Sequence, residues 1–200
     1  MAGDFMTDPR QLQGLNGQQY IVLRPVDAVM REFDVVQDAL RARLGDSVHY
    51  PGAAHVTFRG LHEPDRVDEV RAVVEDWAAQ QHPIEVVTEA VDSFPAPWQI
   101  VIARLARTPS LLHAYASLTE TLDRTDLRRI GELPVDDWIF HLSAVYAKGL
   151  DTEAWEKLAS DSQRDYASRP AETITEVEFV SYFDGAEHRE VFPLAAAAGI

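Results

Sequence analysis

The sequence predicts an α+β fold built mostly of antiparallel sheet. Segments with a strand pattern alternate with helical segments, but some strands also follow one another directly, which is typical of this class. The two halves of the 200-residue chain repeat one order of elements: a helix, a turn-rich approach, a strand with a histidine motif, a helix and two strands. We therefore expect a single unit with two similar lobes over residues 20–194. A loose leader is expected over residues 1–19 and a short tail over residues 195–200.

The first half is predicted to open with a strand and a long helix. Residues 20–26 form a run of β-type residues that Pro25 stops. Asp27 is a suitable N-cap for the following helix, and Gly45 can end that helix at its C′ position. Apolar residues at helical spacing predict its buried face: Val29, Phe33, Val36, Leu40 and Leu44.

A second strand and helix follow, and then a pair of strands. Residues 55–59 alternate as in a strand, and Pro64 and Asp65 open a helix that Pro83 ends. The buried face of this helix is predicted from Val67, Val70, Val74 and Trp77. Two strands are expected next, over residues 84–94 and 98–105.

The second half repeats this pattern with its own helices and strands. Thr108 and Pro109 are typical of a helix start, and Leu111, Tyr115, Leu118 and Leu122 form the predicted buried face. A strand over residues 138–147 and a helix over residues 151–166 follow. Strands over residues 174–182 and 189–194 then form a hairpin that turns near Asp184-Gly185.

The composition excludes several classes of function. The net charge is −15, so a broad basic surface for duplex nucleic acid is not expected. There is no cysteine, which excludes disulfides, thiolate zinc sites and cysteine nucleophiles and agrees with a cytoplasmic protein. No apolar run is long enough to span a bilayer, and residues 1–19 lack the pattern of a secretory signal. We expect a monomer that does not associate with a membrane.

Two short motifs carry the predicted chemistry. Residues two apart on a strand share a face, so His55 and Thr57 point the same way, as do His141 and Ser143. The residues between them are apolar and are expected to face a core. If the lobes face each other, two imidazoles and two hydroxyls line one cleft. Two histidines across a phosphate form a general base and a general acid without a metal, and the hydroxyls can bind phosphate oxygens.

These motifs resemble those of the 2H phosphoesterases. His55-Val56-Thr57-Phe58 and His141-Leu142-Ser143-Ala144 are similar, in spacing and element order, to the paired motifs of the 2′-5′ RNA ligase-like group. The resemblance extends from Tyr20 to Leu194. It implies a two-lobed, pseudo-symmetric fold with flanking helices and a central cleft. It also implies metal-independent chemistry on 2′,3′-cyclic phosphates or 2′-5′ linkages.

Two further residues are candidates for substrate binding. Arg59 continues the face of His55 and Thr57 and can reach a phosphate there, or it is a solvated residue at the strand end. Trp98 offers a surface on which a base can stack, or it plugs the edge of the core. Lys148, just beyond the second motif strand, is expected at the surface.

A metal site is not expected. His49, His55 and His62 are spaced six and seven residues apart, but this spacing across a turn and a strand defines no ligand geometry. Asp136 and Asp137 can orient an imidazole or cap a turn. No Rossmann or P-loop glycine pattern is present, so no cofactor is expected.

Three functions remain open from the sequence. The first is a phosphoesterase acting on a small nucleotide or a short RNA end that carries a cyclic phosphate. The second is a binding module that captures a nucleotide or phosphorylated metabolite in the same cleft without turnover. The third is a metal-dependent hydrolase, which a chelator would inactivate.

Overall fold

The computed structural model describes residues 5–6 and 9–196. Within them, ten strands join into one sheet in which every pairing is antiparallel. The strands are β1 (Gln18–Leu23), β2 (Val56–His62), β3 (Ile84–Phe94), β4 (Ile100–Leu105), β5 (Arg129–Ile130), β6 (His141–Tyr146), β7 (Arg164–Asp165), β8 (Ala171–Ile174), β9 (Glu176–Phe183) and β10 (Ala186–Pro193). Their order is β10-β9-β1-β2-β6-β4-β3-β7, with β5 paired to β2 and β8 to β3. The α+β class is thereby confirmed.

The sheet has two halves that meet at β2 and β6. One lobe consists of β10, β9, β1, β2 and β5, and the other of β6, β4, β3, β7 and β8. β2 and β6 pair only at Val56 and Leu142, so a single position joins the lobes within the described sheet. The two histidine motifs flank this position, one on each strand.

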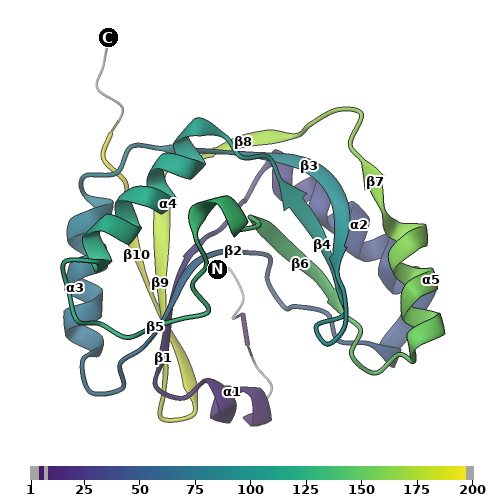
Figure 1. Ribbon diagram of the computed structural model, residues 1–200, viewed down its shortest axis with the longest axis horizontal. Coiled ribbons are helices and arrows are strands. Elements are labelled where there is room, and N and C mark those ends of the chain that lie inside the picture. The colour runs from purple at the N-terminus through teal and green to yellow at the C-terminus, as the bar shows by residue number, and fades with distance from the viewer. Residues whose placement is uncertain (1–4, 7–8, 197–200) are drawn as a thin grey trace.

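Helices cover the outer side of both lobes (Figure 1). They are α2 (Ala28–Leu44), α3 (Val67–Ala78), α4 (Pro109–Leu122) and α5 (Thr152–Ser162), with short 3₁₀ turns at Gly45–Ser47 and Val135–Asp137. α3 contacts β9 and β10, whereas α2 contacts β6, β3 and β8. α4 and α5 both contact β3. α1 (Pro9–Leu15) lies apart from these four helices and contacts β9.

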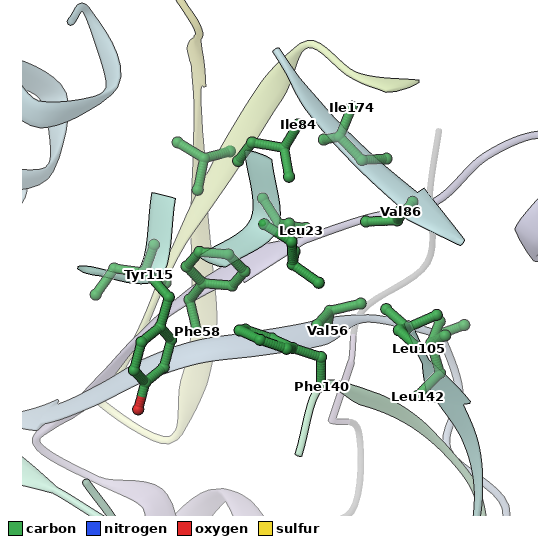
Figure 2. Close-up of a cluster of buried hydrophobic side chains, with 14 of the residues drawn as sticks. Leu23, Val56, Phe58, Ile84, Val86, Leu105, Tyr115, Phe140, Leu142 and Ile174 are labelled. Atoms are coloured by element: carbon green, nitrogen blue, oxygen red, sulfur yellow. The ribbon is translucent and has the colours of Figure 1, made fainter. Parts of the chain in front are cut away.

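The core between helices and sheet fixes which way the motif strands face. Val56 and Leu142 are fully buried in the main hydrophobic cluster, together with Phe58 and Phe140 (Figure 2). Successive strand residues point to opposite faces. The histidine and hydroxyl side chains beside Val56 and Leu142 therefore lie on the face away from this core.

Several predicted elements agree with the structure, and some boundaries differ. The hairpin turns at Asp184 and Gly185, whose φ values are 53° and 72°, as a type I′ turn requires. The strand expected over residues 138–147 is shorter, since β6 begins at His141. The helix expected over residues 151–166 ends at Ser162, because Arg164 and Asp165 pair with β3 as β7.

The expectation of a loose leader over residues 1–19 is wrong for its described part. α1 spans Pro9–Leu15, and Phe5 is buried. Phe5 packs in a second apolar cluster with residues of β1 and β9, and the side chains of Leu12 and Leu15 lie against that cluster. β9 lies far along the chain, so no local pattern could reveal this packing. Of the expected tail, residues 197–200 lie outside the described residues.

In the part of the chain that the structure describes, no helix is both long and apolar enough to cross a membrane.

Candidate active site

The two histidine motifs lie side by side where the lobes meet. Because β2 and β6 are antiparallel and pair between the motifs, His55 is level with Ser143 and Thr57 is level with His141. Each motif thus places its hydroxyl beside the imidazole of the other. All four residues are half-buried, so they are open to a ligand on this face.

The two imidazoles are held in the same way. Nδ1 of His55 lies 3.2 Å from the carbonyl oxygen of Ala53, and Nδ1 of His141 lies 2.7 Å from that of Ile139. Because a carbonyl can only accept, Nδ1 carries the proton in each neutral ring and Nε2 has a free lone pair. Among the described residues, neither Nε2 has a hydrogen-bond partner. Both Nε2 atoms are therefore available for proton transfer.

The electrostatics of the site favour neutral imidazoles. Burial lowers the pKa of His55 to about 4, although its bond to Ala53 opposes this change. The charges of Arg24 and His141 lower the pKa of His55 further, and Glu178 raises it. Burial also lowers the pKa of His141. The influence of one histidine on the other indicates that the two rings share one electrostatic environment.

An arginine lies level with each histidine on the neighbouring strand. Arg24 directly follows β1 and is level with the first histidine, whereas Arg104 of β4 pairs with the second. Arg24 binds both carboxylate oxygens of Glu178 at 2.6 and 3.0 Å. Arg104 binds Asp92 at 2.8 Å. The two lobes therefore repeat not only the motifs but also an arginine–carboxylate pair beside each of them.

An aromatic ring lies against each imidazole. The ring of Phe5 meets His55 edge-on, with 4.4 Å between centroids. The ring of Phe94 meets His141 edge-on at 4.9 Å. These contacts remove water from one side of each imidazole, which agrees with the lowered pKa values.

A cavity of about 210 Å³ opens beside His55 and Thr57. Its polar lining includes Tyr20, His49, Tyr146 and Tyr182, none of which the sequence singled out as part of the site. A signal was present for Tyr20, since it shares a strand face with Val22 and Arg24. The other three come from segments that only the fold brings together.

Arg59 does not lie on the face of His55 and Thr57, which corrects that expectation. The pairing with β1 shifts here, because Val22 pairs with Thr57 whereas Ile21 pairs with Arg59. This bulge breaks the two-residue alternation of the strand. Arg59 is only 1% exposed and turns toward α4.

The surroundings of Arg59 show where it binds instead. Its guanidinium stacks on Tyr115 at 3.6 Å and donates a hydrogen bond to the hydroxyl of Thr119. It also lies 3.4 Å from the carboxylate of Glu132. Through these partners, buried Arg59 links the bulge in β2 to α4 and to Glu132.

Trp98 does not plug the core edge. It lies between β3 and β4 with 58% of its surface exposed, and Lys148 Nζ lies 5.4 Å from its ring centroid. Lys148 lines a wider cavity of about 670 Å³, which shares His49 and Tyr146 with the smaller one. The two cavities therefore adjoin, and together they are lined by residues from His55 to Lys148, although neither is lined by Trp98 itself.

The other candidates are placed elsewhere. Asp136 and Asp137 form a short 3₁₀ turn, where Asp136 is exposed and faces Arg107 at 3.9 Å. His62 binds the side chain of Arg128. Within the described residues, no group of three or more His, Cys, Asp or Glu side chains is placed to hold a metal ion.

Comparison with known proteins places this arrangement in a family. The model of the 2′-5′ RNA ligase superfamily matches residues 25–186. TT0787 of Thermus thermophilus is similar in fold, with a TM-score of 0.66 and 14% identity over 90% of this chain and 100% of that one. A crystal structure described as a phosphoesterase has a TM-score of 0.58 and 13% identity over 90% and 99%.

The Escherichia coli LigT, crystallised with 3′-AMP, has a TM-score of 0.53 and 14% identity over 90% of this chain and 98% of its own. No curated protein sequence matches the chain. At these identities the structures establish the likeness of fold alone. The family model covers most of the chain, and the protein belongs to the 2′-5′ RNA ligase superfamily of 2H phosphoesterases.

Proposed function

We propose that this protein is a metal-independent phosphoesterase that acts on the 2′,3′-cyclic phosphate or 2′-5′ phosphodiester of a small nucleotide or RNA end. The observation that carries this proposal is the pair of imidazoles with open Nε2 atoms, each level with a hydroxyl of the opposite strand. Membership of the superfamily supports a phosphoesterase-type enzyme.

The two imidazoles supply both proton transfers of hydrolysis. In its neutral form, one Nε2 takes a proton from water while the water oxygen forms a bond to phosphorus. The other histidine, in its protonated form, gives its proton to the leaving ribose oxygen as the P–O bond breaks. After the reaction the two rings have exchanged protonation states, and solvent restores them. In the ligation direction the same groups exchange roles.

The hydroxyls of Thr57 and Ser143 can hold the phosphate between the rings. Among the described residues, neither hydroxyl has a hydrogen-bond partner in the protein, so each is free to donate to a non-bridging oxygen. Arg24 and Arg104 flank the rings, and their charge favours an anionic group at this position. Arg24 also opposes protonation of His55 in the empty site, and a bound phosphate offsets this effect.

The wider cavity can accommodate the rest of a nucleotide. The wider cavity leads past His49 and Tyr146 to Lys148, which lies against the exposed ring of Trp98. This ring can stack on a base. LigT has been crystallised with 3′-AMP, NADP⁺, ATP and phosphate, which supports small nucleotides as the ligand class here.

The test is turnover of a panel of 2′,3′-cyclic mononucleotides in the presence of a chelator. We expect hydrolysis by the wild type and almost none by His55→Ala or His141→Ala. His82→Ala, which changes an exposed histidine, is the matched control and should keep full activity.

Two outcomes would favour the alternatives. Nucleotide binding without turnover of any panel member indicates a binding module that uses the same cleft. Turnover that the chelator abolishes and added metal restores indicates a metal-dependent hydrolase. Either result would overturn the proposed mechanism.

A further inference from the structure

A short segment of the N-terminal region is fastened to β10 beside the candidate site. The strap, which we define as Phe5 and Met6, donates its two backbone N–H groups to the two carboxylate oxygens of Glu187, at 3.0 and 2.9 Å. The side chain of Glu187 is only 2% exposed, and it also accepts a hydrogen bond from Tyr182 at 3.1 Å. Hydrogen bonds to a charged carboxylate are strong, so Glu187 holds the strap in place.

The anchored strap places the ring of Phe5 on the first motif histidine. The ring is 7% exposed, its centroid lies 4.4 Å from that of the His55 imidazole, and the two planes meet at 68°. The guanidinium of Arg24 lies over the same ring at 4.0 Å. The ring of Phe5 therefore removes water from one side of both the imidazole and the guanidinium.

The second lobe obtains the same contact from its own sheet. Phe94 belongs to β3, and its ring meets that of His141 at 4.9 Å with 85° between the planes. In the first lobe the matching ring comes from the strap, which precedes α1 and lies outside the strands. The environment of His55 thus depends on a segment outside the sheet, whereas that of His141 is completed by a strand.

Several titratable and charged groups act on His55 together with this ring. Burial has the largest effect on its pKa and lowers it to about 4. The charges of Arg24 and His141 lower the pKa further, whereas Glu178 raises it. Because burial dominates, the response to loss of the ring should follow the access of water to the imidazole. The cavity beside His55 is also lined by the titratable side chains of Tyr20, His49, Tyr146 and Tyr182.

We propose that Phe5 is a positioning residue for His55, and that Glu187 acts on the same histidine through the strap. The ring of Phe5 keeps water from the imidazole and fixes its tilt, so that Nε2 stays directed at the substrate. The catalytic consequence rests on the proposed function, whereas the effect on the imidazole does not. Loss of the ring would hydrate both His55 and Arg24, and both changes favour the protonated imidazole.

The first test is an NMR titration of the histidine ring protons in wild type, Phe5→Ala and Glu187→Gln. His55→Gln and His141→Gln identify the two signals. Phe5→Ala should raise the pKa of His55 by about one pH unit or more and leave that of His141 unchanged. Glu187→Gln replaces one acceptor oxygen of the anchor by an NH₂ group, so it should raise the pKa of His55 by a smaller amount.

The second test is the pH profile of turnover on a 2′,3′-cyclic mononucleotide. In Phe5→Ala the acid limb of kcat/KM should move to higher pH with the pKa of His55, while the alkaline limb stays in place. At the pH optimum kcat should fall about tenfold and KM should change less than about threefold, because the ring orients a catalytic group. Phe5→Leu retains an apolar cover and should restore most of the wild-type behaviour.

Two variants are matched controls. Phe94→Ala should give the reciprocal result, with a raised pKa for His141 and an unchanged pKa for His55. Phe183 is a partly exposed aromatic residue stacked on His188 at the end of β9, and it does not line either cavity of the site. Phe183→Ala should therefore leave the pKa of both motif histidines unchanged. Circular dichroism of every variant checks that the fold is retained.

The outcomes separate this inference from the proposed function. If the wild type turns over no cyclic nucleotide, the proposed function fails, and the NMR titration still decides the role of Phe5. An unchanged pKa of His55 in Phe5→Ala overturns the inference, as does an equal rise for His55 and His141. A raised pKa with an unchanged pH profile overturns its catalytic part. If only Glu187→Gln has no effect, the role of Glu187 is wrong, and if Phe5→Ala does not fold, Glu187→Gln decides.

Discussion

The two histidines are expected to act as one catalytic unit. His55→Ala and His141→Ala should each lower kcat by about a thousandfold, because each removes one proton transfer. The kcat of the double variant should be no more than about tenfold below that of the less active single variant, because the loss of either histidine already disables the pair. Single-turnover kinetics on a cyclic mononucleotide measures all three. Losses that simply multiply would contradict a shared acid–base pair.

The hydroxyls should matter less than the imidazoles. Thr57→Ala and Ser143→Ala each remove one hydrogen bond to a charged group, which corresponds to about a tenfold to hundredfold loss of kcat/KM. Thr57→Ser and Ser143→Thr retain the hydroxyl and are the matched controls. Unchanged kcat/KM in both alanine variants would show that these hydroxyls do not bind the phosphate.

The lowered pKa values set the pH range of the free enzyme. One histidine must be neutral and the other protonated, so kcat/KM should follow a bell-shaped pH profile. Because the pKa of His55 is about 4 and that of His141 is lowered below its ordinary 6.5, the maximum should lie between these limits. This holds whichever ring is the base. A bound phosphate favours the protonated rings, so the profile of kcat should lie at higher pH. A profile with a single limb would contradict the two-histidine scheme.

The same shift links the stability of the fold to pH. Above about pH 6.5, His55 is neutral in both the folded and the unfolded chain. As the pH falls from 6.5 toward about 4, the unfolded chain binds a proton that the folded chain does not, so the free energy of unfolding decreases.

The loss is at most about 3 kcal/mol, and water at this half-buried residue reduces it. Urea unfolding at about pH 7 and pH 4.5 measures the difference, which His55→Gln should diminish and the exposed-site variant His82→Gln should leave unchanged. If the free energy of unfolding depends on pH identically in wild type and His55→Gln, the pKa of His55 is not lowered in the folded protein.

At the scale of the element, the bulge in β2 indicates that Arg59 stabilises the fold and does not bind substrate. Arg59→Ala removes the stack on Tyr115 and the bonds to Thr119 and Glu132, so the free energy of unfolding should fall by about 2–3 kcal/mol. Under conditions where the variant is folded, kcat/KM should stay within about threefold of the wild type. Arg124→Ala, at an exposed arginine just after α4, should change stability by less than about 0.5 kcal/mol. A large loss of kcat/KM without a loss of stability would indicate that Arg59 binds substrate.

The buried faces of the helices were easier to predict from the sequence than the bulge in β2. The helical faces of α2, α3 and α4 followed from apolar spacing, because a helix buries one stripe of its surface wherever it packs. The bulge between Thr57 and Arg59 depends on pairing with β1. Pairing is a contact between distant segments, and local alternation does not record it.

At the scale of the whole molecule, the charge of −15 should disfavour long polyanions. We expect a cyclic mononucleotide to be hydrolysed with at least the kcat/KM of a long RNA that carries the same terminus. The part of this difference that comes from long-range repulsion should shrink as salt is raised, because the screening length falls to about 8 Å near physiological ionic strength. A strong preference for the long RNA at low salt would contradict this expectation.

Local patterns in the sequence were enough to predict the fold class, the buried faces of the helices and the two histidine motifs. Apolar periodicity and the two-residue alternation of strands are local properties, so His55, Thr57, His141 and Ser143 could be assigned to one face without a structure. The tertiary structure alone decided that these strands meet at a single pair, that Arg59 turns into the core, and that Phe5 lies against His55. These last features depend on packing between segments far apart in the chain, and that packing is governed by the whole fold rather than by neighbouring residues.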